Sequence, residues 1–290
     1  MKKLRMRKES LEVKITIIVF FALFIFCAVW NLSAAGYAIL NSLKTATDYF
    51  DNGDFALPKT VQFINYVKIF SVFEVNGYTY LSMFWNSMWM LVLHVFCNVL
   101  SSTLLAYPLA KFRFPGKEFL YALVIFTNTI PIIGSGATEF KVMFELGMVD
   151  NPSLIWFSWC CGFDFAFIVF YGAFKGVSDT YSEAARIDGA NNIQVFLTII
   201  LPQVVPCIVA ISITQAMSVW NNYAISMIYL RSYPTLAYGL YLFHSANFLI
   251  EDSIPIYFAA AVVSAIPVII LYSCSQKLLL TNVTAGGLKG

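Results

Sequence analysis

The residues of this sequence that could perform catalysis are few and lie far apart. Its two histidines, His94 and His244, are widely separated, and neither belongs to a His-Glu-x-x-His zinc motif. All six cysteines fall in apolar stretches without the spacing of a metal site, so they are expected to be buried thiols. The terminal "GGLKG" lacks the spacing of a Gly-x-x-x-x-Gly-Lys-Ser/Thr phosphate loop. The sequence therefore argues against an enzyme and predicts no metal ligand and no cofactor bound by this chain.

A carboxylate inside an apolar stretch is the strongest single indication of a functional site. Asp164 lies in the middle of "WFSWCCGFDFAFIVFYGAF". A charged group at membrane depth is costly and is expected to face the interior of a helix bundle or a cavity. It could hydrogen-bond a polar ligand there, with Trp159 or Phe163 as a flat face for stacking. Alternatively it could bind a neighbouring helix or face a partner subunit, and the sequence leaves these alternatives open.

A second candidate group stands in "MSVWNNYAIS". Asn221 and Asn222 are adjacent, so on a helix they would point about 100° apart, one toward a pathway and the other toward a neighbouring helix. Trp220 and Tyr223 could flank a ligand, although aromatic residues in membrane proteins more often serve packing. His94 is expected to hydrogen-bond between helices.

The composition shows what kind of element must position these residues. The 290 residues are 59% hydrophobic, 17% aromatic and only 12% charged, which indicates an integral membrane protein. A helix must cross a hydrocarbon core of about 30 Å, and open backbone is not tolerated in lipid. The sequence predicts one all-α transmembrane domain over residues 1–290 with six transmembrane helices, at about 15–40, 85–110, 118–138, 153–174, 206–230 and 255–279.

The distribution of charge predicts how these spans are oriented. With the N-terminus inside, most of the 18 Lys and Arg residues fall in cytoplasmic segments. Both termini are therefore expected in the cytoplasm, and residues 41–82 form an external lobe. The basic start followed by an apolar run is too long for a signal peptide, so it is expected to be a retained first span. The net charge of +2 reflects this asymmetry and does not indicate nucleic-acid binding.

The predicted cytoplasmic loop at 175–205 has the pattern of two short helices. Thr180 and Glu183 have the spacing of a capping box, so the first helix is expected to begin there, and Gly189 should end or bend it. Its small side chains suit close docking of another protein, although a helix lying on the inner leaflet is an open alternative. These side chains are Ala184, Ala185, Ile187 and Ala190.

The second short helix of this loop should begin with an asparagine cap, Asn191 or Asn192. Leu201-Pro202 is expected to stop it before the fifth span opens at Pro206.

The stretch "EAARIDGANNIQVFLTIILP" resembles the cytoplasmic loop of membrane subunits of bacterial ATP-binding-cassette (ABC) importers, with Glu-Ala-Ala, three residues, Gly, nine residues, Ile, one residue and Leu-Pro. The residues that match are Glu183, Ala184, Ala185, Gly189, Ile199, Leu201 and Pro202. Asp188, in "DGA", resembles the carbohydrate-importing branch. Further similarity to the maltose-type partner subunit lies in "NS" at 86–87, "AYPLAKFRFPGK" at 106–117, "LGMVDNP" at 146–152, "WNNY" at 220–223 and "TAGGLKG" at 284–290.

Three residues depart from the pattern of that family. Pro108 stands in place of a usual Ala, Ser178 in place of a common Pro, and Asn222 in place of an acidic residue. The first two should be tolerated locally, whereas the third puts an inherited role for that position in doubt.

The resemblance implies a bacterial cytoplasmic-membrane importer with several partners. Such importers pair two permeases, here a heterodimer, with two nucleotide-binding subunits that hold ATP and Mg and with an external binding protein that delivers the sugar. The loop helix docks on a nucleotide-binding subunit, with Glu183 as the charged contact, Gly189 as the bend and the alanines allowing close approach. The rival functions are an ion-coupled secondary transporter, which needs no such loop, and an ABC importer of a non-carbohydrate solute.

Overall fold

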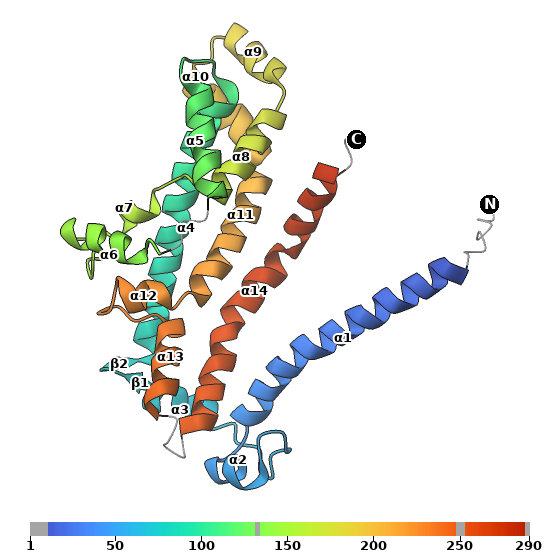
Figure 1. Ribbon diagram of the computed structural model, residues 1–290, viewed down its shortest axis with the longest axis vertical. Coiled ribbons are helices and arrows are strands. Elements are labelled where there is room, and N and C mark those ends of the chain that lie inside the picture. Colours follow the sequence, from blue (N-terminus) through green and yellow to red (C-terminus); the bar gives the residue numbers. More distant parts are fainter. Residues whose placement is uncertain (1–10, 131–133, 248–252, 288–290) are drawn as a thin grey trace. The chain divides into compact units, whose positions relative to one another are not determined.

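The computed structural model describes residues 11–130, 134–247 and 253–287 (Figure 1). It divides into two compact units, one formed by Met1–Phe73 with His244–Val263 and the other by Glu74–Phe243 with Ser264–Gly290. In the described residues, four helices are long and apolar enough to cross a membrane: Leu11–Ser42, Tyr80–Lys111, Asn192–Asn221 and Ser253–Gln276. The prediction of a multi-pass, mainly helical membrane protein is therefore confirmed.

The first unit begins with α1 (Leu11–Ser42), a helix that is apolar on every side. Large side chains such as Phe20, Phe21 and Phe24 are all more than half exposed. A helix of this kind is stable only where lipid or protein covers it on all sides. The unit also includes the start of α14 (Ser253–Gly287), in which Phe258 meets the ring of Tyr37 edge-on with centroids 5.5 Å apart.

The segment after α1 folds around a buried lysine. Lys44 is fully buried, and its ammonium donates hydrogen bonds to the carbonyls of Gly53 at 3.0 Å and Asp54 at 2.8 Å. Burial lowers the pKa of Lys44, and the nearby carboxylates of Asp48 and Asp54 oppose that shift. Two short helices, α2 (Ala46–Asn52) and α3 (Asn65–Val72), flank the buried lysine. Residues 43–73 hold only these short helices, whereas residues 80–82 of the expected lobe at 41–82 already belong to α4; the external location of the lobe stays a prediction.

A small hairpin shows that the fold is not purely helical. Strands β1 (Glu74–Val75) and β2 (Tyr78–Thr79) pair antiparallel across Asn76 and Gly77, which both have positive φ. Asn-Gly is the preferred sequence for such a two-residue turn. The hairpin leads directly into α4.

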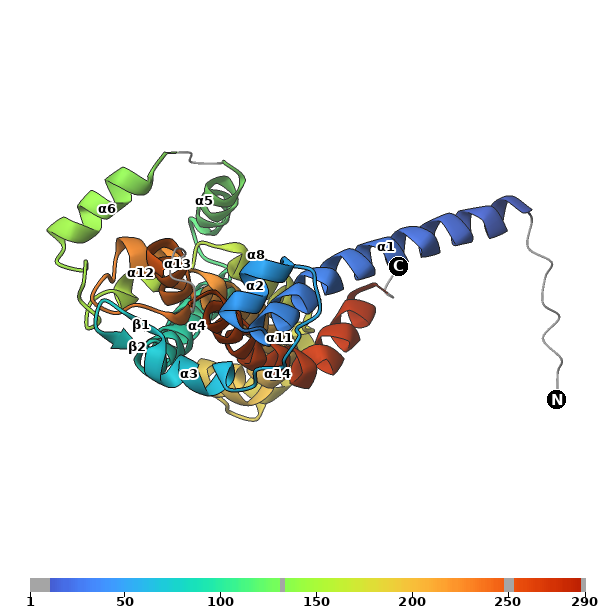
Figure 2. The same cartoon turned by 90° about the horizontal axis from the view of Figure 1, so that it is seen from below.

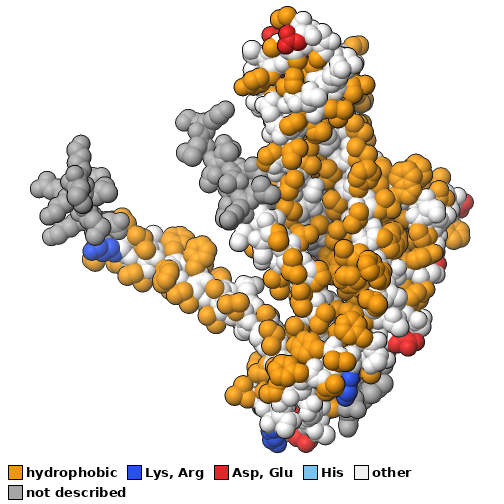
Figure 3. Space-filling model, turned by 180° about the vertical axis from the view of Figure 1, so that it is seen from behind, with side chains coloured by type: hydrophobic (Ala, Val, Ile, Leu, Met, Phe, Trp, Pro, Cys, Tyr) orange, Lys and Arg blue, Asp and Glu red, His pale blue; other side chains and the backbone are white. Residues whose placement is uncertain are grey.

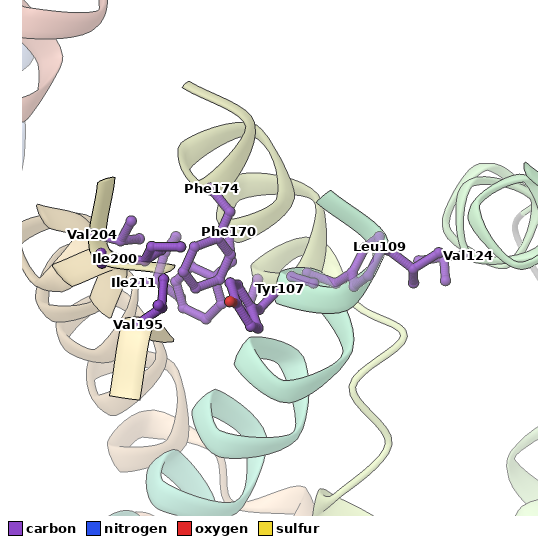
Figure 4. Packing of buried hydrophobic residues seen from close by; sticks show 13 residues of the cluster. Tyr107, Leu109, Val124, Phe170, Phe174, Val195, Ile200, Val204 and Ile211 are labelled. Atoms are coloured by element: carbon purple, nitrogen blue, oxygen red, sulfur yellow. The ribbon is translucent and has the colours of Figure 1, made fainter. Parts of the chain in front are cut away.

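The second unit is built on three packed helices, α4 (Tyr80–Lys111), α8 (Phe165–Gly176) and α11 (Leu201–Asn221). Figure 4 shows their side chains meeting, with Phe170 and Phe174 of α8 between Tyr107 of α4 and Ile211 of α11. The rings of Tyr107 and Phe174 lie 5.6 Å apart. Outside this core, hydrophobic side chains cover most of the face seen in Figure 3, as expected of a surface that contacts lipid.

Two of the six expected spans are not continuous helices. The described part of residues 118–138 holds α5 (Lys117–Thr129) and the beginning of α6 (Gly136–Glu145), and Figure 2 shows these as separate helices. Residues 153–174 contain the single turn α7 (Trp156–Trp159), a break and then α8. Neither α5 nor α8 has the roughly 20 residues that a straight span needs. The remaining elements are α9 (Asp179–Ile187), α10 (Asn192–Gln194), the π-helical stretch η1 (Val195–Ile200), α12 (Ala224–Ile228) and α13 (Leu236–Asn247).

The break before α8 passes close to α4 at a glycine. Gly162 has φ +65°, and a Cβ placed there would lie 2.5 Å from Leu105 Cδ1 and 3.1 Å from the backbone carbon of Ser101. Backbone cannot yield as a flexible side chain can, so only glycine fits at this position.

The substitution Gly162→Ala is expected to destabilise the second unit by at least about 1–2 kcal/mol, because it adds left-handed strain and a clash with α4. The readout is the melting temperature of the detergent-purified protein. Gly172→Ala in α8 is the matched control, since a Cβ there meets open space and alanine favours a helix. Equal melting temperatures for both variants would contradict the close approach of Gly162 to α4.

Candidate functional site

The loop predicted to contact an ATPase folds as the short helix α9 (Asp179–Ile187) followed by the start of a long helix, and its first cap is not the predicted one. α9 begins at Asp179, and the hydroxyl of Ser178 accepts a hydrogen bond from the backbone N–H of Thr180 at 3.3 Å. The expected start at Thr180 is therefore wrong by about two residues. Ser178 stands in the place of a family proline and caps the helix with its own side chain.

The end of α9 and the start of the next helix follow the prediction. Gly189 has φ +87°, the left-handed conformation that ends a helix, and Ala190 N–H bonds back to Ala185 at 2.9 Å. Asn191 and Gln194 form a reciprocal capping box, each side chain accepting from the other's backbone N–H.

The expected stop at Leu201-Pro202 does not occur. The helix runs from Asn192 through η1 into α11 and ends at Asn221. The N–H of Leu201 reaches the carbonyl of Phe196, five residues back, instead of the usual four. This wider turn makes room for the ring of Pro202, which would otherwise collide with a carbonyl of the preceding turn.

Burial separates the two alanines that were expected to act together. Ala185 is buried in the core shared by α4, α8 and α11, whereas Ala184 and Glu183 are exposed. The exposed face also carries Ile187, which is 87% exposed, and Tyr181, which is 57% exposed. Ala185 therefore attaches α9 to the bundle, and the opposite face of α9 stays exposed; docking of a partner there stays a prediction. The remaining predicted members, Asp188 and Pro202, are exposed, and Leu201 is half-buried.

A salt bridge fixes the start of α9 to the end of α4. Lys111 Nζ lies 2.7 Å from Asp179 Oδ1 and also donates to the carbonyl of Val177. The hydrogen bond and the positive charge of Lys111 lower the pKa of Asp179. Residue types alone do not show which charged side chains pair, so the sequence could not predict this ion pair.

Asp164 is not in the middle of a helix as expected, because it is the N-cap of α8. Its carboxylate accepts hydrogen bonds from Asn98 Nδ2 at 2.7 Å and Ser102 Oγ at 3.1 Å, and from the backbone N–H of Phe167 at 3.3 Å. Gln215 of α11 in turn donates to Asn98 Oδ1 at 3.4 Å. The carboxylate thus satisfies the start of α8 and binds it to α4; a role in transport stays a prediction.

The polar partners of Asp164 were missed although the sequence carries a signal for them. His94, Asn98 and Ser102 stand four residues apart on α4 and therefore share one helix face. The expected hydrogen bond of His94 is not seen: its Nδ1 is buried with no partner among the described residues. Its ring packs instead against Trp159, with centroids 5.0 Å apart.

The two tryptophans proposed as ligand faces are core residues. Trp159 is 8% exposed, and Trp220 is 6% exposed and donates its Nε1 to the carbonyl of Ser264 at 3.0 Å. The indole of Trp220, with its buried hydrogen-bond acceptor, is stabilised by packing. Trp220 also lines an apolar pocket with Met217 and Pro267, and a ligand role for the two tryptophans stays a prediction.

The asparagine pair lies at a helix end rather than within a helix. Asn221 is the last residue of α11, with its Nδ2 on the carbonyl of Met217 at 2.8 Å. Asn222 is extended, and its Oδ1 accepts the N–H of Ala224 at 2.9 Å, so its side chain helps to start α12. Tyr223 is 43% exposed and stacks on Tyr241 of α13, a residue that the sequence analysis did not single out.

The family model described as "Binding-protein-dependent transport system inner membrane component" matches residues 99–284. The match includes the loop with α9 and the whole of α8 and α11. The chain belongs to this family of ABC transporter permeases. Members of the family are transport subunits and not enzymes themselves, and the ATPase is a separate subunit.

Individual relatives extend the similarity over nearly the whole chain. AraQ of Halalkalibacterium halodurans, an arabinooligosaccharides transport system permease protein, is 29% identical over 290 residues, covering 98% of this chain and 99% of AraQ. MelC of Bacillus subtilis, a melibiose/raffinose/stachyose import permease protein, is 25% identical over 256 residues, covering 87% and 89%.

Solved structures agree with the fold. A chain of a bacterial ABC transporter involved in the import of the acidic polysaccharide alginate matches with a TM-score of 0.76 at 26% identity, covering 93% of this chain and 99% of that one. A chain from a structure of a bacterial alginate ABC transporter in complex with an alginate pentasaccharide-bound periplasmic protein matches with a TM-score of 0.61 at 16% identity and so shows the fold alone.

Replacing Asp179 by Asn should loosen α9 by a few tenths of a kcal/mol, the usual value of an exposed ion pair. Because the pKa of Asp179 is lowered, its contribution is complete above the ordinary carboxyl pKa of about 4 and is lost only below the lowered value. Hydrogen exchange of the α9 amides should therefore be faster in Asp179→Asn by the same factor throughout about pH 6–8. Glu145→Gln is the control. A ratio of exchange rates between variant and wild type that changes with pH over this range would contradict the ion pair between Lys111 and Asp179.

Replacing Asp164 by Leu should cost about 3 kcal/mol or more, because three donors lose their acceptor at about 1–3 kcal/mol each when buried. Asp164→Asn keeps one acceptor oxygen and should cost less. Melting in detergent measures both, with Asp51→Leu on an exposed helix as the control. A Leu variant as stable as the wild type would show that the cap and the bonds to α4 do not hold α8.

Proposed function

We propose that this chain is one of two permease subunits of an ABC importer that carries a sugar or oligosaccharide across the cytoplasmic membrane. The observation that carries the proposal is the α9 loop, a short helix fixed to the bundle on one face and exposed on the other. The family supports import, and the relatives named for arabinooligosaccharides and for melibiose, raffinose and stachyose support a carbohydrate.

The loop is built to transmit movement into the bundle. Ala185 packs into the core, Lys111 holds Asp179, and η1 continues without a break into α11. A displacement of α9 by a partner would therefore move α8 and α11 with it, because packed interiors are rigid rather than continuously deformable. Glu183, Ala184, Asp188 and Gly189 would form the surface against the ATPase, and that partner would hold ATP and Mg.

The proposed assembly follows from this arrangement. A different permease completes the pathway, two nucleotide-binding subunits bind below the loops, and an external binding protein delivers the sugar. In the proposed topology α5 and α8 with their flanking breaks serve as the third and fourth of six spans, and both termini lie in the cytoplasm. Irregular backbone at membrane depth is tolerated where protein buries it, as at Asp164.

The length of α11 supports opposite locations for its two ends. Its 21 residues rise roughly 1.5 Å each, which gives about 30 Å, the thickness of the hydrocarbon core. If the α9 loop is cytoplasmic, then Asn221, Asn222 and Tyr223 lie near the external face, where a delivered substrate would enter. Asp164 is linked through Asn98 to Gln215, which precedes Asn221 by six residues, about 9 Å along α11, and it would lie on the path between the two faces. Uptake lost in Asp164→Asn with assembly intact would support such a role, and normal uptake would remove it.

Substitution of Glu183 by Lys, or of Gly189 by Val, should abolish sugar uptake while ATP hydrolysis persists, because the ATPase no longer moves the bundle. The measurement is uptake of radiolabelled arabinotriose, raffinose and maltotriose in cells that express the complete transporter, with ATPase activity of the purified complex. Glu118→Lys, also exposed and in the neighbouring predicted cytoplasmic segment, is the matched control.

Normal uptake in both loop variants would contradict the docking role. Uptake that survives deletion of the ATPase and stops with an ionophore would establish the ion-coupled alternative. Transport of a non-carbohydrate solute with none of the three sugars would refute the substrate class alone.

A further inference from the structure

Three tyrosines form a slab of near-parallel rings at the junction of α11, α12 and α13. Tyr223 and Tyr241 stack with centroids 5.1 Å apart and planes 8° apart, and Tyr238 and Tyr241 have centroids 6.5 Å apart and planes 16° apart. Tyr223 is 43% and Tyr241 48% exposed, and Tyr238 is half-buried. We call these three residues the tyrosine platform.

The platform is held from beneath by contacts between α13 and α4. Ser87 Oγ accepts the N–H of Leu236 at 2.8 Å, and Asn86 Nδ2 donates to the carbonyl of Pro234 at 3.0 Å. A Cβ on Gly239, between two of the tyrosines, would lie 2.2 Å from the sulfur of Met83, so α13 rests directly on α4. Figures 1 and 2 both show α13 beside α4.

A second set of contacts fixes the connection between α12 and α13. Ser226 is fully buried, and its hydroxyl lies 3.2 Å from the carbonyl of Tyr233 and 3.3 Å from Thr235 Oγ1. Tyr78 of the hairpin donates to the carbonyl of Ser232 at 2.6 Å, and Asp150 accepts the N–H of Ser232 at 2.9 Å. The rings are therefore exposed but pre-ordered, which lowers the entropy cost of binding a ligand.

We infer that the tyrosine platform binds a sugar ring of the transported oligosaccharide at the external entrance of the pathway. Flat phenol faces match the C–H face of a pyranose or furanose, and their hydroxyl edges can exchange hydrogen bonds with sugar hydroxyls. The exposed amide of Asn221 adds a polar group at the same end of α11. Aromatic faces and phenol hydroxyls suit a neutral, hydroxyl-rich ligand better than a charged headgroup, since the three stacked tyrosines carry no charge. This inference rests on the proposed function and names one of its contact surfaces.

The test compares Tyr241→Ala, Tyr241→Phe and Tyr223→Leu in the complete transporter, with uptake of arabinotriose, raffinose and maltotriose measured over a range of concentrations. Tyr223→Leu keeps the platform testable if the Ala variant fails to assemble. Tyr272→Ala is the matched control, since Tyr272 is 50% exposed and lies on α14.

The expected result is a rise of about tenfold in the apparent KM of uptake for Tyr241→Ala and Tyr223→Leu. Tyr241→Phe, which keeps the flat face, should change it by less than about twofold. The sugar-independent ATPase activity should stay at the wild-type level in all variants, because the α9 loop is untouched.

Three results would overturn the inference. An unchanged KM in variants that assemble would mean that the tyrosines only anchor the chain at the membrane–water interface, where tyrosine is common. An unchanged KM with a reduced maximal rate, and with less ATPase stimulation by the binding protein, would assign the platform to protein docking. With either of these two results, sugar uptake by the wild type would leave the proposed function intact. A wild type that takes up none of the three sugars would refute the proposed function and the inference together.

Discussion

Backbone groups inside a membrane must find hydrogen-bond partners within the protein, and this constraint governs the centre of the second unit. The chain breaks between α7 and α8, which would leave the first N–H groups of α8 without acceptors. The carboxylate of Asp164 provides an acceptor for Phe167 and is itself held by Asn98 and Ser102 of α4. One ionisable side chain thus permits the break and also fixes α8 to the helix on which the bundle is built.

The same bundle connects the loop to the far end of α11. Ala185 and the π-helical stretch attach α9 to α8 and α11, and Pro202 is accommodated by the wide turn instead of ending the helix. The proposed docking of an ATPase on α9 requires that a displacement of the loop reach the far end of α11. A continuous helix with a well-packed core is the simplest way to carry a displacement over about 30 Å.

Some candidate pathway residues serve packing or capping in the folded protein, and others remain exposed. Trp159 and Trp220 are used for packing, and Asn222 is used to start α12. Tyr223 remains exposed and stacks on Tyr241, which in turn stacks on Tyr238, from a segment that is apolar and unremarkable in the sequence. The residues that retain an open face are therefore those at a helix junction, where side chains have fewer neighbours to pack against.

The sequence by itself determined the membrane class, the long helices and the family loop, because these depend on local composition and on spacing within a few turns. It also determined the ends at Gly189 and Asn191, which depend on backbone conformation and side-chain caps close by in the chain. The sequence did not determine that Asp164 caps a helix, that Ala185 faces inward, or that three tyrosines stack at a helix junction. Those features depend on which helices meet, so only the tertiary structure could decide them: a polar or aromatic side chain takes its role from neighbours that are distant in sequence.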